Sequence, residues 1–153
     1  MPGSFHALQP LLTALSAALG QQVGLDRHGE CALAFDDDVE IVIAPTPEAD
    51  LLTIRCAVTA AGQVMDTRTL RGALGLNHAH LPPGYALSLD TDTPSGCDQL
   101  MLLAVLPSTG LPADALVHHV EGFVALVPEL RAQLRAQPAA ARPDSMLLHS
   151  LGV

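Results

Sequence analysis

Three consecutive aspartates, Asp36 to Asp38, are the first residues whose type and spacing suggest chemistry. Neighbouring carboxylates often bind hard cations. A calcium loop, however, requires alternating acidic positions, a central glycine and a distal glutamate, and this stretch has no such pattern. Alternating apolar residues flank the aspartates at 31–35 and 39–43, and aspartate is favoured in turns because its side chain bonds nearby backbone N–H groups. The pattern therefore favours the turn of a β-hairpin over a metal site.

Histidines form the other ligand-like group. His118 and Glu121 are three residues apart, so on a helix they share one face, with His119 beside them and with His78 and His80 elsewhere in the chain. The His-Glu-x-x-His spacing that brings two imidazoles and a base together is missing. We therefore interpret these histidines as solvent-facing, and we expect no metal.

No nucleophile stands in a recognisable motif. The chain has no Gly-x-Ser-x-Gly sequence, and neither Ser88 nor Ser95 has a base at a motif spacing. The three cysteines, Cys31, Cys56 and Cys97, lie far apart without a Cys-x-x-Cys pair. Cys31 and Cys56 fall in strand-like alternations and are expected as small buried apolar residues. These observations predict a protein that is not an enzyme and needs no cofactor.

Charge narrows the classes of partner. Asp and Glu number 16, against seven basic residues that are all arginine, which gives a net charge of −9 over 153 residues. Nucleic acids and anionic lipid surfaces attract cationic proteins, so both are poor candidates as partners. The N-terminus has no basic stretch followed by a long apolar one, and no segment approaches the ~18 apolar residues of a membrane span. We expect a cytoplasmic protein.

Hydrophobic periodicity predicts the elements that must position any site. Period-two alternation indicates strands, and apolar spacings of three and four indicate helices. The first expected element is a helix that ends at Gly20 and, because of Pro10, either begins near Gln9 or bends there. Strands are expected near 31–35, 39–43, 52–58, 85–89 and 100–106. Two further helices are expected, one over 67–80 with Asp66 as N-cap and one over 114–137 with a kink at Pro128.

This order predicts an α+β fold with an antiparallel sheet in the order α-β-β-β-α-β-β-α. We expect residues 1–137 to form one domain and residues 138–153 to form a Pro/Ala-rich tail. Because residues 100–106 are apolar throughout, their strand is expected to be covered on both faces. Gly72 and Gly75 weaken the helix over 67–80, which therefore needs a packing partner.

Taken in order, the sequence blocks resemble a known family. The blocks lie between Leu11 and Leu134 and read "LLTALSAALG", "DRHGECALAF", "LLTIRCAV", "LRGALGLN" (ending at Asn77), "GYALSLD", "LMLLAVLP" and "LVHHVEGFVALVPELRAQL". Each block alone is a generic apolar pattern, so the resemblance depends on their order and spacing. The chain resembles the class I type III secretion chaperones of the Tir-chaperone (CesT-like) family, small acidic dimers that hold bacterial effectors before export.

This resemblance implies a homodimer and a secreted effector as partner. The family binds an effector's N-terminal segment in extended form over apolar grooves and a sheet edge, without ATP. The expected effector-binding residues are Phe5, Leu8, Leu12, Leu15, Leu33, Phe35 and Ile41. The expected dimer-interface residues, on the second helix and fourth strand, are Leu70, Leu74, Tyr85, Leu87 and Leu89. A small metal-dependent enzyme that uses the histidines and aspartates, or a protein-interaction domain of the same fold outside secretion, remains an alternative.

Overall fold

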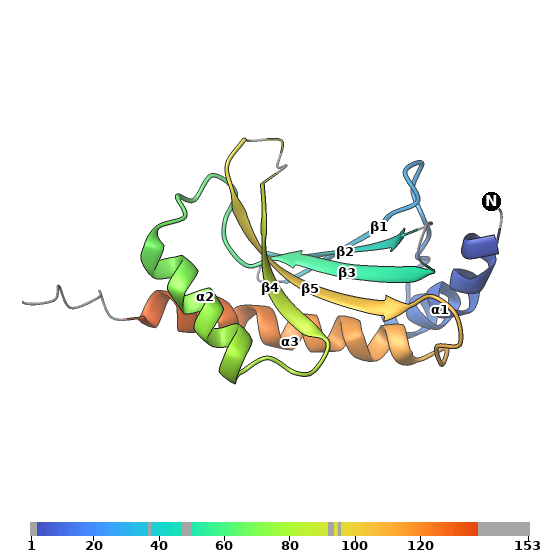
Figure 1. Cartoon of the computed structure of the whole chain (residues 1–153). Helices are drawn as coiled ribbons and strands as arrows, with labels where there is room; N and C mark the ends of the chain where they lie inside the picture. The colour runs from blue at the N-terminus through green and yellow to red at the C-terminus, as the bar shows by residue number, and fades with distance from the viewer. Residues whose placement is uncertain (1–2, 37, 47–49, 92–93, 95, 138–153) are drawn as a thin grey trace, which may run out of the picture.

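The computed structural model describes residues 3–36, 38–46, 50–91, 94 and 96–137, and for residues 3–7 only the backbone is described. The elements follow the predicted order, and the α+β prediction is confirmed (Figure 1). The predicted tail, residues 138–153, lies outside the described residues. The elements are α1 (Gly3–Leu19), β1 (Cys31–Phe35), β2 (Val39–Thr46), β3 (Leu51–Ala57), α2 (Thr67–Ala79), β4 (Tyr85–Asp90), β5 (Gln99–Pro107) and α3 (Ala115–Ala136).

The five strands form one antiparallel sheet in the order β1-β2-β3-β5-β4, so β1 and β4 border it. β1 and β2 pair as a hairpin, with Leu33 opposite Ile41. Asp36 and Asp38 lie in the connecting turn, while Asp37 is outside the described residues. Asp38 has a φ of 56°, a left-handed conformation that aspartate tolerates better than most residues. The predicted hairpin turn is confirmed.

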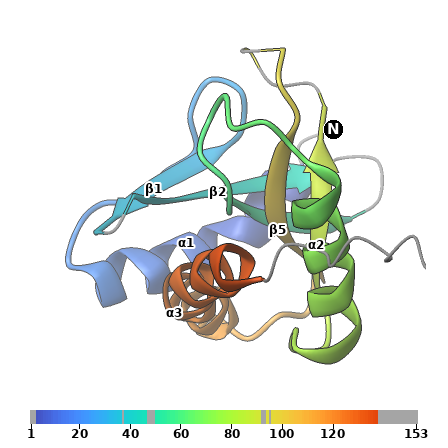
Figure 2. The ribbon, with the colours of Figure 1, turned by 90° about the vertical axis from the view of Figure 1, so that its left-hand side faces the viewer.

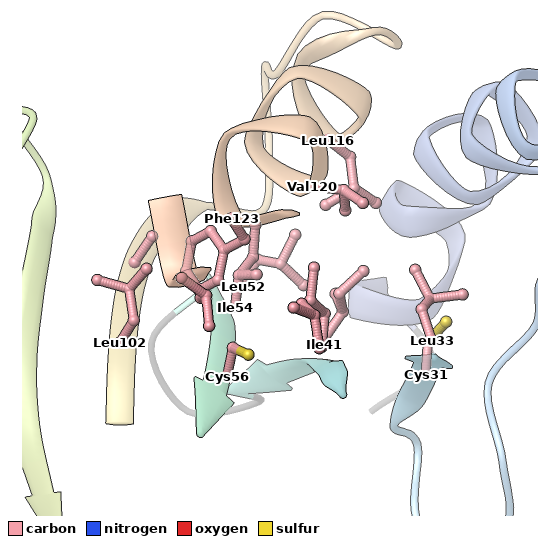
Figure 3. Close-up of a cluster of buried hydrophobic side chains, with 14 of the residues drawn as sticks. Cys31, Leu33, Ile41, Leu52, Ile54, Cys56, Leu102, Leu116, Val120 and Phe123 are labelled. Carbon is pink, nitrogen blue, oxygen red and sulfur yellow. The ribbon is translucent and has the colours of Figure 1, made fainter. Parts of the chain in front are cut away.

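Helices α1 and α3 cover one face of the sheet, and α2 lies beside β4 (Figure 2). The core is between these two layers. Phe123 of α3 meets Ile54 and Leu102 of the sheet in this core (Figure 3), and all three side chains are fully buried. Burying one such side chain contributes roughly 1.5–3 kcal/mol, so this layer contact stabilises the fold.

β3 and β5 show how the sheet's two faces differ. Along β3, burial alternates as the sequence predicts. β5 lies between β3 and β4, but the expectation that both its faces are covered is wrong for the single chain. Met101 and Leu103 are only half-buried on the outer face, and Val105 is 44% exposed. The reason is that α1 and α3 both pack on the opposite face (Figure 2).

Both prolines lie inside helices. α1 begins at Gly3 and continues through Pro10, so the expectation of a start near Gln9 is wrong, and α3 continues through Pro128. A proline inside a helix removes one backbone hydrogen bond and costs about 3 kcal/mol. Leu8 and Leu11 around Pro10 are buried in the core, so tertiary packing holds the helical backbone despite that local cost.

Helix α2 begins as predicted. The Asp66 carboxylate accepts a hydrogen bond from the Thr69 N–H at 2.7 Å, and this bond holds the pKa of Asp66 below its usual value. The glycine predicted to weaken the helix allows a close approach. A Cβ on Gly72 would lie 2.7 Å from the Gln137 side chain, so the end of α3 passes against α2 at this point.

Candidate functional site

An apolar hollow of about 270 Å³ lies between α1 and α3, beside the β1 border of the sheet. Ala18 and Leu19 form its α1 side, Val117 and Val124 its α3 side, and Phe35, at the end of β1, is half-buried there. Small side chains on the two helices leave the space between them unfilled. The hollow also includes Leu15, Val120, Glu121 and Ala125.

Most predicted effector-binding residues are buried in the core and do not line this hollow. Only Leu15 and Phe35 are among its lining residues. The others with described side chains are fully buried in the core, at 5% exposure or less: Leu8, Leu12, Leu33 and Ile41. The side chain of Phe5 lies outside the described residues.

Sequence reasoning missed the α3 side of the hollow. Val117 and Val124 are seven residues apart on α3, so they share one helical face. That face lies next to the fully buried face formed by Leu116, Phe123 and Val127. The sequence did contain a signal, because these valines form a second apolar face of α3 beside the buried one. That signal does not reveal that the space between α1 and α3 is left unfilled.

Charge lies at the rim of the hollow. Glu121 is one of its lining residues and is exposed. His118 is next to it on α3, with 3.7 Å between His118 Nδ1 and Glu121 Oε2 and 3.5 Å between His118 Nε2 and Asp114 Oδ2. All three side chains are 71% exposed, so these contacts contribute little to stability. Glu121 thus places one carboxylate among the residues that line the apolar hollow.

The β4 border carries the predicted dimer-interface residues. Leu74 on α2 is 69% exposed and Leu89 on β4 is 41% exposed, which is unusual for large apolar side chains. Leu70 and Tyr85 are half-buried, whereas Leu87 is buried within the chain. Exposed large apolar side chains of this kind are typical of protein–protein interfaces.

Tyr85 connects β4 to α3. Its hydroxyl lies 2.9 Å from His119 Nδ1, and its ring packs at 5.3 Å between centroids on Phe123. Burial raises the pKa of Tyr85, while burial and the nearby His118 lower the pKa of His119. The neutral imidazole is thus favoured in the folded chain.

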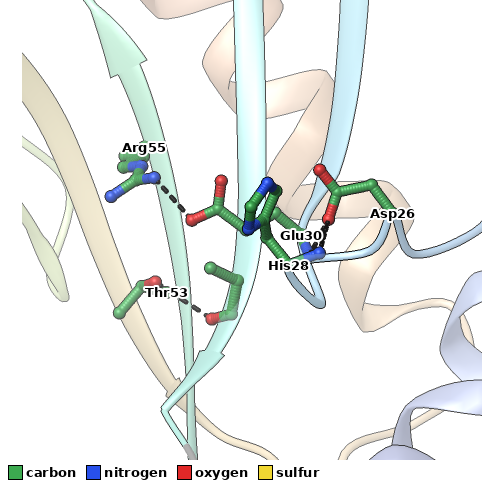
Figure 4. A network of polar contacts seen from close by, with 6 residues as sticks. Asp26, His28, Glu30, Thr53 and Arg55 are labelled. Atoms are coloured by element: carbon green, nitrogen blue, oxygen red, sulfur yellow. Dashed lines mark hydrogen bonds and ion pairs between the residues drawn. The ribbon is translucent and has the colours of Figure 1, made fainter. Parts of the chain in front are cut away.

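Polar contacts pin the strands near β1. The Asp26 carboxylate accepts hydrogen bonds from the N–H groups of His28 and Glu30 and so shapes the loop before β1. Glu30 then pairs with Arg55 of β3 at 2.7 Å, and Thr53 of β3 donates to the backbone of β2 (Figure 4). These contacts hold the loop before β1 in place and have a structural role.

A second hollow, of about 390 Å³, lies at the other end of α3. Its central residue, Arg131, donates hydrogen bonds of 3.0 to 3.1 Å to the backbone carbonyls of Asp38, Ala57 and Val58. Arg131 therefore ties α3 to the end of β3 and to the hairpin turn. Its carbonyl contacts give it a structural role there.

Within the described part of the chain, no group of three or more His, Cys, Asp or Glu residues could hold a metal ion. Burial raises the pKa of Cys56 to about 11 and also raises that of Cys31, which keeps both thiols protonated. Among the described helices, none is long and apolar enough to cross a membrane. The features that remain on the surface are the apolar hollow and the exposed apolar side chains at the β4 border.

Comparisons with known proteins agree with this description. The model of the Tir chaperone protein (CesT) family matches residues 10–131. No sequence of a curated protein matches the chain significantly.

Solved structures share the fold at low sequence identity. The chain is similar to one in the HopA1–SchA chaperone–effector complex (TM-score 0.66, 20% identity, 86% of this chain and 98% of that one). It is also similar to one in the ExsC–ExsE complex (0.63, 19%, 90% and 98%). A third likeness is to the structure of the Yersinia pestis type III secretion chaperone SycH with a fragment of YscM2 (0.55, 19%, 78% and 96%). Since the family match spans most of the sequence and the fold agrees with it, this chain belongs to the Tir chaperone protein (CesT) family.

Proposed function

We propose that this protein is a type III secretion chaperone that binds the N-terminal segment of a cognate effector in extended form and keeps it soluble for export. Family membership supports the chaperone role, and similar folds occur in chaperone–effector complexes. The single observation that carries the proposal is the apolar hollow beside a border strand. An extended segment needs such pockets for alternate side chains and a strand edge for its backbone.

The hollow is the anchor site in this proposal. Leu15, Ala18, Leu19, Phe35 and Val124 receive one or two apolar side chains of the effector segment. The segment's backbone runs along β1, the border strand that contributes Phe35. Because an extended segment loses conformational entropy on binding, several such anchors are needed, and each contributes roughly 1–3 kcal/mol.

The buried members of the predicted set have a supporting role. Leu8, Leu12, Leu33 and Ile41 hold α1 and β1 in place from within the core, so their replacement would unfold the site instead of testing it. For Phe5, direct contact with the effector stays a prediction. Binding in this scheme involves no covalent step and no ATP, which makes the protein a binding partner and not an enzyme.

We further propose that the functional unit is a homodimer in the bacterial cytoplasm. Leu74, Leu89, Leu70 and Tyr85 would meet their symmetry mates. An isologous interface buries the same apolar patch on both subunits, which explains why side chains as large as Leu74 are exposed in the single chain. The net charge of −9 keeps the remaining surface soluble.

The first experiment identifies the partner. The tagged full-length chain is purified from the bacterium that encodes it, under conditions that induce secretion, and co-purifying proteins are identified by mass spectrometry. A secreted protein bound through its N-terminal region is the expected result. Recovery of only cytosolic enzymes or apparatus components would contradict the chaperone function and favour an interaction domain outside effector delivery.

The second experiment locates the anchor with a matched pair of variants. Ala17 and Ala18 are both exposed, but only Ala18 is among the residues that line the hollow. Ala18→Asp places a carboxylate where an apolar anchor should sit and is expected to weaken binding of the identified N-terminal segment roughly tenfold or more. Ala17→Asp adds the same charge and should bind like the wild type. Equal affinities for both variants, measured by calorimetry, would show that this hollow is not the anchor.

A further inference from the structure

Asn77, near the end of α2, makes a paired contact with a border strand. Its side-chain oxygen accepts a hydrogen bond from the Leu87 N–H at 2.6 Å, and its side-chain NH₂ donates to the Leu87 carbonyl at 3.0 Å. A carboxamide carries the same donor and acceptor as a peptide group. Asn77 therefore bonds to β4 as a residue of an added strand would.

The contact lies on the free edge of the sheet. β4 pairs with β5 on one side only. In an antiparallel pair, residues whose peptide groups face the partner strand alternate with residues whose groups face away. Because Leu87 gives both groups to Asn77, the groups of Tyr85, Leu87 and Leu89 face outward.

Two of these three outward positions are already engaged. The N–H of Tyr85 donates to the Pro82 carbonyl at 3.1 Å, and both groups of Leu87 are bonded to Asn77. An incoming strand would need several consecutive outward groups, and on β4 the N–H of Tyr85 and both groups of Leu87, at the centre of the edge, are already bonded. The other border differs: within the described part of the chain, no side-chain hydrogen bond to the backbone of β1 is recorded.

We propose that Asn77 closes the β4 edge against strand addition and thereby directs an extended partner segment to β1. The β1 half of this statement rests on the proposed function, whereas the closure of β4 rests on geometry alone. Unprotected edge strands pair readily with other chains, so closing one edge also limits self-association. It follows that contact between two copies across α2 and β4 uses side chains and does not extend the sheet from β4 to β4.

The test uses only the full chain and no effector. Asn77→Ala removes both hydrogen bonds, and Asn77→Asp keeps the size and the acceptor but loses the donor. His78→Ala is the matched control, since His78 is the next residue on α2 and has no recorded bond to β4 among the described residues. Circular dichroism confirms folding, sedimentation velocity gives the mass over a wide concentration range, and hydrogen exchange reports on β4 and β1.

The expected result for Asn77→Ala has two parts. At low concentration the Leu87 amide exchanges roughly tenfold faster than in the wild type. At high concentration the variant forms assemblies larger than those of the wild type, and the amides of Leu87 and Leu89 regain protection as it does so. His78→Ala should match the wild type in both measurements.

A folded Asn77→Ala protein that keeps the wild-type mass at every concentration, without renewed protection of β4, would overturn the proposal and leave Asn77 as an anchor for α2 only. If Asn77→Ala does not fold, the same measurements on Asn77→Asp decide between these outcomes. Neither result changes the proposed function, because no effector is present in the test.

Discussion

At the β1 border of the sheet, apolar side chains surround a hollow between α1 and α3, whereas at the β4 border they stand out from α2 and from the strand itself. Phe35 is half-buried at the first border, while Leu74 is 69% exposed at the second. A concave apolar surface suits a single inserted side chain, and a protruding one suits a partner surface of similar shape. Under the proposed function, the two borders therefore suit two different kinds of partner.

The two border strands also differ in the hydrogen bonding of their outward backbone groups. On β4, Asn77 and Pro82 bond to outward peptide groups of Leu87 and Tyr85, so under the proposed edge closure contact there uses side chains. β1 pairs with β2 on one side only, and among the described residues no side chain bonds to its backbone. One sheet can thus present a border for a second folded copy and another for an unfolded segment, without the two competing for the same hydrogen bonds.

The largest expected effect is a loss of folding stability, and it distinguishes residues of the core from residues that line the hollow. Leu12 is 4% exposed, and Leu12→Ala should lower the free energy of unfolding by roughly 2–5 kcal/mol because it leaves a cavity. Leu19 is half-buried at the wall of the hollow, and Leu19→Ala should cost only about 1 kcal/mol. Urea denaturation measures both. Similar losses for the two variants would mean that the hollow wall is part of the core.

The next effect concerns the β4 border. Leu74→Asp introduces two charges into a symmetric interface and should weaken dimerisation roughly a hundredfold, leaving a folded monomer at micromolar concentration. Val64→Asp is the control, since Val64 is 83% exposed in the loop before α2. Light scattering gives the masses. A Leu74→Asp protein that remains a dimer would exclude α2 from the interface.

The rates at which the cysteine thiols react give a smaller effect, which compares the buried core with the exposed surface near β4. Burial raises the pKa of Cys56 to about 11 and also raises that of Cys31; both lie in the core, Cys31 on β1 and Cys56 on β3, whereas Cys97 is exposed between β4 and β5. In native protein, Cys97 should react with a thiol reagent at least roughly tenfold faster than the other two. In Cys97→Ser, reaction should require denaturant. Rapid native reaction of Cys31 would show that the β1 border opens frequently.

The smallest effect is on pH dependence. The pKa of His119, beside Tyr85, is held below 6.5 by burial and by His118, so unfolding binds protons and the stability contributed by His119 decreases as the pH falls below 6.5. The pKa of Asp26, beside β1, is held below 3.8, chiefly by the Glu30 N–H, so its stabilising contribution is lost only at more acidic pH.

Urea denaturation at about pH 7.5 and about pH 5.5 tests this separation. His119→Gln should reduce the loss of stability between the two values, whereas Asp26→Asn should leave it unchanged. The opposite pattern would place the pH-sensitive contact at the β1 border.

Much of the fold was predictable because local patterns report local structure. The alternation Leu52, Ile54, Cys56 and Val58 predicted the buried face of β3, and the position of Asp66 predicted the start of α2. The family resemblance followed from the order of such elements. In each case the structure depends on residues that are close together in the sequence, through the spacing of apolar side chains or through a capping hydrogen bond. Such local structure can therefore be predicted from the sequence directly.

The site was less predictable because apolar periodicity identifies a face but not what covers it. The sequence by itself determined that Leu12 and Leu33 are on apolar faces, and only the tertiary structure decided that they are buried in the core and do not line the hollow. The same holds for the contact between Asn77 and Leu87. Burial and edge closure depend on how distant segments pack, and that packing is set by the whole chain at once.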